Sequence, residues 1–344
     1  MDRDLVNQLL DQAGASRNRD VLAEIIRTAF ELAGDDADRL NLKITRDALK
    51  EMRSAFKVFA PYEGVRKVTV FGSARTHPSD PLYEQARLLA QSLAENGWMI
   101  VTGAGPGIME AANVGAGRDQ SFGVNIRLPF EEGVSELFAA SDKFVSMKYF
   151  FTRKLMLIKE SSGFVSLPGG FGTLDETFEL LTLFQTGKAT PAPLVLLDVH
   201  GEHGEHGSYW RGWQRFVDEE LAVRGLISPG DPSLYTITDD VEEAAAVVRG
   251  FWRNYHSIRW VGPRLVIRLN AEPTDAEVAQ LNEEFADLCT EGGITRTEPL
   301  AAEASDRDEL GRPRLLLCFD VRQGGRFRTL IESLNQLPSA PPLS

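Results

Sequence analysis

Residues 167–176, with the sequence LPGGFGTLDE, place three glycines between two contrasting patterns. Residues 163–167 before them are a short apolar run typical of a buried strand, and residues 173–185 after them are amphipathic like a helix. Strand, glycine turn and helix in this order predict an α/β fold. Glycines let backbone N–H groups approach an anion, and a helix N-terminus adds partial positive charge. The segment therefore predicts a phosphate site at Gly169, Gly170, Gly172 and Thr173.

Glu176 follows this predicted anion site within one helical turn. A carboxylate fixed beside a phosphate site suggests chemistry on a phosphorylated small molecule. A structural alternative exists, because Thr173 and Glu176 also have the Thr-x-x-Glu spacing of a capping box. A cap needs no glycines, so the three glycines favour a ligand site. Glu179, one turn further, either faces the same crevice or is a solvated helix position.

Short apolar segments alternate with amphipathic ones between about residues 65 and 255. This alternation predicts a Rossmann-like, doubly wound parallel sheet with helices on both faces. The expected strands are 67–71, 98–102, 122–128, 144–146, 164–167 and 194–199, and two of the expected helices are 82–96 and 107–116. Three glycine clusters each follow a strand and should converge on one crevice at the carboxyl ends of the strands. The first two clusters contribute Gly72, Ser73, Gly103, Gly105 and Gly107.

The cluster at residues 103–107 is not a dinucleotide fingerprint. The third glycine position of the fingerprint is Ile108, and the cluster follows the second strand of the unit rather than the first. Asn125 stands where an acidic residue would hold the ribose. These departures argue against a nicotinamide dehydrogenase and favour a loop that lines a mononucleotide site, with a plain tight turn as the alternative.

The flanking regions predict two further parts. Residues 1–62 read as a helical extension, with one helix from Asp20 to Gly34 whose apolar face includes Val21 and Ile25, and a second helix capped by Thr45. Residues 63–258 form the Rossmann-like domain. Residues 259–344 suggest a small α+β appendix of βαββα order, ferredoxin-like in type, for regulation or subunit contact. Its expected elements are strand 264–270, helix 274–290, a turn at 292–293, strands 294–299 and 314–320, and helix 327–335.

Composition excludes several classes of function. The 344-residue chain has 37 Lys and Arg against 50 Asp and Glu, a net charge of −13, which argues against nucleic-acid or anionic-membrane partners. The two cysteines, Cys289 and Cys318, form no disulfide framework, and no signal peptide or membrane-spanning run is visible, so we expect a cytoplasmic protein. His200, His203 and His206 alternate with acids and could hold zinc or nickel, but their glycine-rich setting favours a polar loop, so we expect no metal and no cofactor.

Three ordered motifs resemble those of the LONELY GUY (LOG) family, whose members are cytokinin riboside 5′-monophosphate phosphoribohydrolases and related nucleotide nucleosidases. Residues 168–176 are similar to the family signature Pro-Gly-Gly-x-Gly-Thr-x-x-Glu, residues 103–110 with Met109 resemble its glycine-rich loop, and residues 151–154 resemble its Arg-Lys element. The resemblance covers about residues 65–255. One departure is Ala104, which stands in place of a loop glycine and should add a methyl near the ligand.

The resemblance implies hydrolysis of the N-glycosidic bond of a nucleoside 5′-monophosphate, giving free base and ribose 5-phosphate. It implies Arg153 and Glu176 as catalytic residues, with Lys154 beside them; without it, Arg153 reads as a helix-surface residue. Many relatives were once labelled lysine decarboxylases, but no lysine here has a recognisable pyridoxal setting. A homodimer is also implied, with apolar surface at Phe150, Phe151, Leu155 and Ile158. The alternative is a nucleotide-binding or carrier protein that has lost turnover.

Overall fold

The computed structural model describes residues 3–127, 138, 141–199 and 208–343, and its contacts divide the chain into two compact units, Met1–Lys57 and Val58–Ser344. The first unit contains α1 (Arg3–Gln12), α2 (Arg19–Gly34) and most of α3 (Arg39–Phe59). The predicted boundaries at residues 62 and 258 remain predictions.

The N-terminal helices agree with the sequence in kind but differ in two details. The predicted cap at Thr45 is wrong, because α3 begins at Arg39 and the Thr45 hydroxyl donates to the carbonyl of Asn41 inside the helix. The carboxylate of Asp38 accepts from the backbone N–H groups of Leu40 and Asn41 and so caps α3 instead. Helix α2 has nearly the predicted bounds, but Val21 and Ile25 on its apolar face are exposed.

The second unit is built around a seven-stranded parallel sheet in the order β4-β3-β2-β1-β5-β6-β7. Its strands are β1 (Lys67–Phe71), β2 (Met99–Thr102), β3 (Ser121–Ile126), β4 (Phe144–Met147), β5 (Gly163–Ser166), β6 (Leu194–Leu197) and β7 (Thr236–Thr238). The predicted doubly wound fold is confirmed. Six strands match the predicted ones to within a few residues, although Leu128, the expected end of the third, lies outside the described residues; β7 was not predicted because three residues give little pattern.

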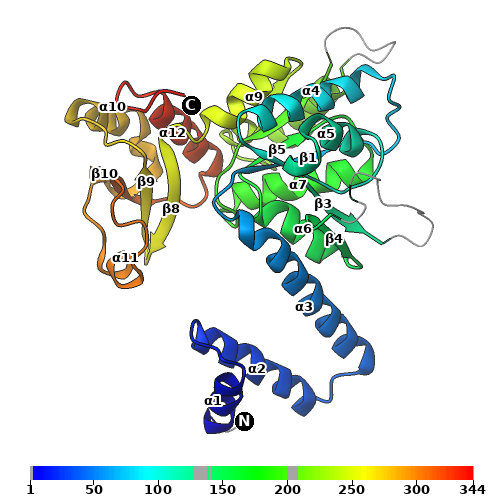
Figure 1. The fold of residues 1–344 in the computed structure, drawn as a ribbon. Coiled ribbons are helices and arrows are strands. Elements are labelled where there is room, and N and C mark those ends of the chain that lie inside the picture. The colour runs from blue at the N-terminus through cyan, green and yellow to red at the C-terminus, as the bar shows by residue number, and fades with distance from the viewer. Residues whose placement is uncertain (1–2, 128–137, 139–140, 200–207, 344) are drawn as a thin grey trace. The chain divides into compact units, whose positions relative to one another are not determined.

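Helices cover both faces of this sheet (Figure 1). One face carries α4 (Pro81–Glu95), α5 (Ile108–Ala116) and α9 (Val241–Gly250), whose apolar side chains share one buried cluster with Val68 and Val70 of β1. On the other face, Thr69 of β1 donates its hydroxyl to the carbonyl of Leu157 in α6 (Phe150–Lys159), which lies beside α7 (Phe171–Gln185). Alternate β1 residues therefore serve opposite layers.

The chain changes direction across the sheet between β1 and β5. From β1 it runs outward through β2, β3 and β4, and then returns to place β5 against the other edge of β1. In open α/β sheets, ligands bind outside the carboxyl ends of the strands at such a switch point. Gly72 follows β1 and Gly169 follows β5, so two of the predicted glycine clusters meet there.

The C-terminal region is an α+β layer, as predicted, but in a different order. A four-stranded antiparallel sheet, β10-β11-β9-β8, is covered by helices. Its elements are β8 (Tyr255–Val261), β9 (Arg264–Leu269), α10 (Asp275–Phe285), β10 (Cys289–Arg296), α11 (Ala301–Asp306), β11 (Arg314–Phe319) and α12 (Gly324–Gln336). The layer opens with a β8–β9 hairpin that the sequence analysis missed, so neither the βαββα nor the ferredoxin-like order applies.

Two further expectations for this layer also need correction. The helix expected over 274–290 ends at Phe285, and the glycine pair expected as a turn, Gly292 and Gly293, lies inside the irregular strand β10. The capping box of Thr274 and Glu277 at the start of α10 is present as predicted.

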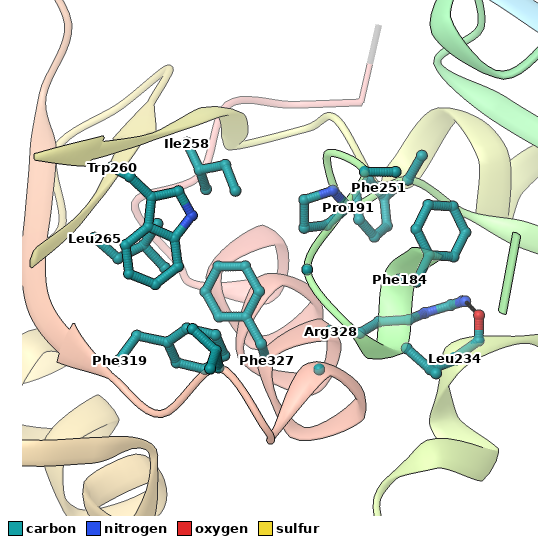
Figure 2. Close-up of a pocket in the computed structure, with 15 residues that line it drawn as sticks. Phe184, Pro191, Leu234, Phe251, Ile258, Trp260, Leu265, Phe319, Phe327 and Arg328 are labelled. Carbon is teal, nitrogen blue, oxygen red and sulfur yellow. Dashed lines mark hydrogen bonds between the residues drawn. The ribbon is translucent and has the colours of Figure 1, made fainter. Parts of the chain in front are cut away.

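The two sheets of the second unit meet around a small apolar pocket (Figure 2). Phe184 and Pro191 of the parallel layer face Ile258, Trp260 and Phe327 of the C-terminal layer across it. Its volume is about 40 Å³, far too small for a nucleotide. At its edge the buried Arg328 donates to the carbonyl of Leu234 and the hydroxyl of Thr236. The pocket therefore belongs to the packing between the two layers.

Candidate active site

A cleft of about 800 Å³ opens at the switch point of the parallel sheet. Its walls come from the segments that follow β1, β2 and β5, together with α6 and the start of α7. The predicted site residues that line it are Gly72, Ser73, Gly103, Gly105, Met109, Arg153, Gly169, Gly170, Gly172, Thr173 and Glu176. Gly107, Lys154 and Glu179 are not among the lining residues.

The loop after β5 delivers a helix N-terminus to the cleft. Helix α7 begins at Phe171 with Gly170 as its N-cap, and no side chain occupies the cap. The free backbone N–H groups and the helix dipole of this first turn favour an anion. A Cβ on Gly169 would lie 2.2 Å from the Thr173 hydroxyl and 3.1 Å from the Ser73 nitrogen, so only glycine fits there.

The capping-box alternative for Thr173 and Glu176 does not hold. Because α7 begins at Phe171, Thr173 is already inside the helix and cannot be its N-cap. Glu176 is consequently free of a capping role, and its side chain lies at the cleft instead. The glycine-rich loop before α7 therefore lines the cleft, and its Gly170 is the N-cap of the helix.

Two glycines of the loop after β2 are required by packing, because a Cβ at either position would clash with neighbouring protein atoms. A Cβ on Gly103 would lie 2.2 Å from the Arg153 guanidinium and 2.8 Å from the Met109 sulfur, so this glycine lets both side chains reach the cleft. Gly107 has a φ of +68°, and a Cβ there would lie 2.4 Å from the Ser73 carbonyl. That carbonyl accepts the N–H of Ile108 at 3.1 Å. Gly107 therefore joins two loops and does not face the ligand space.

Ala104 does not narrow the cleft. It has a φ of +57°, is buried, and its methyl faces Gly123 of β3, 2.9 Å from the position of a Cβ there. The expectation that this methyl lies near the ligand is wrong, because the left-handed backbone of Ala104 turns the side chain into the sheet.

Arg153 and Glu176 meet at the inner wall of the cleft. Nη1 of Arg153 lies 3.7 Å from Oε1 of Glu176, and the two side chains are only 12% and 14% exposed. The Arg153 Nε donates to the carbonyl of Val124 in β3 at 3.1 Å, which fixes the guanidinium plane. Helices α6 and α7 thus bring together the two residues that the family resemblance singled out, from positions 23 residues apart in the sequence.

Burial raises the pKa of the Glu176 carboxyl from 4.5 to about 7, although the charges of Arg153 and Lys154 act to lower it. A carboxyl with a pKa near neutrality can both accept and return a proton at physiological pH. Such a shifted group in a cleft is typical of a functional site.

The raised pKa of Glu176 predicts a pH-dependent stability cost. The folded-state pKa of Glu176, about 7, lies above the unfolded value near 4.5. The stabilising contribution of this carboxyl to the free energy of unfolding is therefore fully present below pH 4.5 and is lost as the pH rises through 7. We expect Glu176→Gln to stabilise the protein at pH 8 by up to about 3 kcal/mol, at ~1.4 kcal/mol per pKa unit, and to be nearly neutral at pH 4.5. Denaturant unfolding of both proteins across this range measures the difference. An equal effect at both pH values would contradict the assignment.

Lys154 and Glu179 lie on the other side of the α6–α7 contact, where they line a neighbouring pocket with Phe151 and Leu155. The Lys154 Nζ is 2.6 Å from Oε2 of Glu179 and 2.9 Å from Oδ2 of Asp175. Burial acts to lower the pKa of Lys154, but its hydrogen bonds with the two carboxylates outweigh this and raise it. A lysine held protonated is a poor Schiff-base nucleophile, which opposes a decarboxylase role for Lys154.

The cleft also contains residues that the sequence analysis did not select. These lining residues are Phe71, Ala74, Arg75, Pro106, Asn125, Ile126, Phe150, Phe171, Leu174 and Asp175. Arg75 is the most informative, because its exposed guanidinium makes no hydrogen bond or ion pair with any residue that the structure describes. Its place two residues after Ser73, in the same loop as Gly72, was the available signal.

Tyr209 supports the loop from outside the cleft lining. Its hydroxyl, on α8 (Tyr209–Phe216), donates to the carbonyl of Gly169 at 2.8 Å. Nothing in the local sequence pattern of Tyr209 connects it to the glycine loop.

Within the described ranges, no group of three or more His, Cys, Asp or Glu side chains could hold a metal ion. His200, His203 and His206 lie outside these ranges, so the expectation that they hold no metal remains a prediction from the sequence. The described helices include none that is long and apolar enough to cross a membrane.

Comparison with known proteins gives a family match over the central part of the chain. Residues 106–248 match the family described as "Possible lysine decarboxylase". A cytokinin riboside 5′-monophosphate phosphoribohydrolase of Mycobacterium marinum is 28% identical over 175 residues, covering 50% of this chain and 87% of the relative. The enzyme of that name from Rhodococcoides fascians is 33% identical over 97 residues, or 28% of this chain, which spans only 44% of that relative.

Solved structures resemble this chain only distantly. A molybdenum cofactor carrier protein from Chlamydomonas reinhardtii is 21% identical with a TM-score of 0.37, covering 54% of this chain and 96% of that one. A molybdenum cofactor binding protein from Rippkaea orientalis is 21% identical with a TM-score of 0.36, covering 52% and 93%. At these values neither neighbour bears on function.

Proposed function

We propose that this chain, whose resemblance to the LOG family the sequence comparisons bear out, hydrolyses the N-glycosidic bond of a nucleoside 5′-monophosphate. The observation that carries the proposal is the Arg153–Glu176 pair, part-buried at the wall of a cleft whose floor is a glycine-lined helix N-terminus. The products would be the free base and ribose 5-phosphate.

The chemistry follows from where charge develops. Breaking the bond between the ribose carbon and the base nitrogen builds positive charge on the sugar, which a nearby carboxylate stabilises. We assign this task to ionised Glu176, which can also orient the attacking water and take its proton. The charge of Arg153 favours the ionised form of Glu176 and the ion pair positions it, while the first turn of α7 would hold the phosphate so that the ribose carbon faces the carboxylate.

Release of a free base is the direct test. Purified protein is incubated with AMP and a panel of purine and pyrimidine monophosphates, including a cytokinin riboside monophosphate, and the products are separated by chromatography. Appearance of base together with ribose 5-phosphate supports the proposal. Tight binding of a nucleotide without base release would instead favour the second candidate, a nucleotide-binding or carrier protein of the same fold.

Arg75 is expected to contribute phosphate affinity. Its exposed guanidinium borders the cleft, and the Oγ of Ser73 accepts the Arg75 backbone N–H at 3.0 Å. Since a hydrogen bond to a charged group contributes about 1.5–3 kcal/mol, Arg75→Ala should raise the KM for AMP about tenfold or more with a smaller change in kcat. Steady-state kinetics test this, with Arg264→Ala, an exposed arginine of β9 outside the cleft, as control. Equal KM values in the wild type and Arg75→Ala would remove Arg75 from the site.

Self-association through α6 is expected as well. Phe150, Phe151 and Leu155 on this helix are exposed, and the pocket beside them is mostly apolar. An apolar helix face of this kind is well suited to a two-fold contact with a second copy. We expect a dimer or larger assembly at micromolar concentration by sedimentation, and Phe151→Asp should weaken it. A fully active monomer would contradict both the contact and any influence of it on the cleft.

A further inference from the structure

The N-terminal unit exposes many large apolar side chains. One buried apolar cluster of this unit consists of Val6, Leu10 and Ala23. Ten large apolar side chains of the same unit are exposed: Leu5, Leu9, Val21, Leu22, Ile25, Phe30, Leu40, Leu42, Leu49 and Phe56. Isolated exposed apolar residues are ordinary, but a concentration of them on three helices marks a contact surface.

On α3 these residues have the spacing of a helix–helix seam. Leu42, Leu49 and Phe56 recur every seven residues, so they lie along one stripe of the helix. Leu42 is 42% exposed and Leu49 is 49% exposed. A seven-residue apolar repeat is the pattern by which one helix packs along another.

The chain's own α2 does not cover this stripe. Between α2 and α3, the N–H of Asp35 donates to the Glu31 carbonyl and that of Ala37 to the Leu32 carbonyl, while Asp36 has a φ of +50°. The Asp38 carboxylate then caps α3. Leu42 and Leu49 of α3 are exposed, as are Val21 and Ile25 of α2.

The two parts of the unit carry opposite charge. Residues 3–38 have eight Asp and Glu against four Arg, a net charge of −4, whereas residues 39–57 have six Lys and Arg against two acids, a net charge of +4. In a chain of net charge −13, a helix of charge +4 is exceptional. The α1–α2 segment of one copy therefore complements the α3 of another in both charge and apolar character.

We propose that α1 and α2 of one copy of this chain pack against α3 of a second copy, in a reciprocal exchange. Each copy gives its segment 3–38, whose net charge of −4 includes Asp35, Asp36 and Asp38 of the turn after α2, and receives that of its partner, so two identical contacts form around one two-fold axis. This contact is separate from the α6 face and from the cleft, because it uses only residues of the N-terminal unit.

Site-directed cross-linking tests the placement. In a Cys289→Ser/Cys318→Ser background, one chain carries Ile25→Cys and a differently tagged chain carries Leu49→Cys; the two are co-expressed and treated with a short bismaleimide. We expect a covalent product that contains both tags. A control pair of Ile25→Cys with Leu88→Cys, an exposed leucine of α4, should give little. A yield no greater than the control overturns the proposal, as does an exclusively intrachain product when Ile25→Cys and Leu49→Cys share one chain.

A second measurement does not depend on cross-linking. Leu42→Asp/Leu49→Asp should weaken self-association at least about tenfold in sedimentation, and high salt should weaken the wild-type contact in part. Because neither leucine lines the cleft, nucleotide binding should be unchanged, which also shows that the variant is folded. An association constant equal to that of the wild type would refute the exchange, whatever the outcome of the base-release assay.

Discussion

Replacing Glu176 with glutamine is expected to lower the turnover of a nucleoside 5′-monophosphate by about two orders of magnitude or more, as removal of a charge-stabilising group does. Glutamine keeps the shape of the side chain but cannot carry the negative charge that the developing sugar cation requires. Nucleotide binding should survive, because the phosphate is held by the first turn of α7. Chromatographic base release gives kcat, and calorimetry gives the affinity.

Glu179→Gln is the matched control for this experiment. Glu179 lies one turn further along α7, but it pairs with Lys154 outside the cleft. We expect near-normal turnover from this variant. Near-normal turnover of Glu176→Gln itself would mean that Glu176 has no part in the reaction, and the raised pKa would then be only a consequence of its burial.

The pH profile adds a check on the form of Glu176 that acts. If the ionised carboxylate is required, kcat/KM should rise with pH up to about 7 and then level off. Loss of the Glu176 proton should therefore raise activity and lower the stability of the fold, because the active, ionised form is the one that burial disfavours.

The fold was readable from the sequence because its signals are local. Strands such as Lys67–Phe71 are short, largely apolar segments, this one followed by Gly72, and the expected ranges needed shifts of only a few residues. The errors arose where two local signals compete. Thr45 resembles a cap, but the carboxylate of Asp38 begins α3 first. Gly292 and Gly293 resemble a turn, yet they form an irregularity inside β10, between the residues Glu291 and Thr295 that pair with β11.

The candidate site could be predicted only in part, because a sequence motif gives the spacing of its residues but not the direction in which their side chains point. The glycine motif correctly predicted that Gly169 and Glu176 approach one cleft. It could not tell that Lys154, next to Arg153 in the sequence, points to the opposite side of the α6–α7 contact. Arg75 was missed since an arginine in a loop is ordinary until the fold places its loop beside another.

The 5′-phosphate is expected to decide which substrates are used. The cleft presents the N-terminus of α7 and the exposed guanidinium of Arg75, and both favour a dianion over a neutral hydroxyl. Binding energy from this non-reacting group orients the ribose against Glu176, so AMP should exceed adenosine in kcat/KM by about 10³-fold. Comparable use of the two substrates would refute the role of the loop.

A single glycine makes this test specific. Gly172 lines the cleft on the first turn of α7, and a Cβ added there meets no atom within 4 Å, so Gly172→Ala should fold normally. Its methyl would enter the space reserved for the phosphate, so we expect kcat/KM for AMP to fall about tenfold or more while adenosine is little affected. Gly250→Ala at the end of α9, equally free of neighbours but remote from the cleft, is the control. If Gly172→Ala lowers kcat/KM equally for AMP and adenosine, or for neither, the phosphate does not bind at this turn.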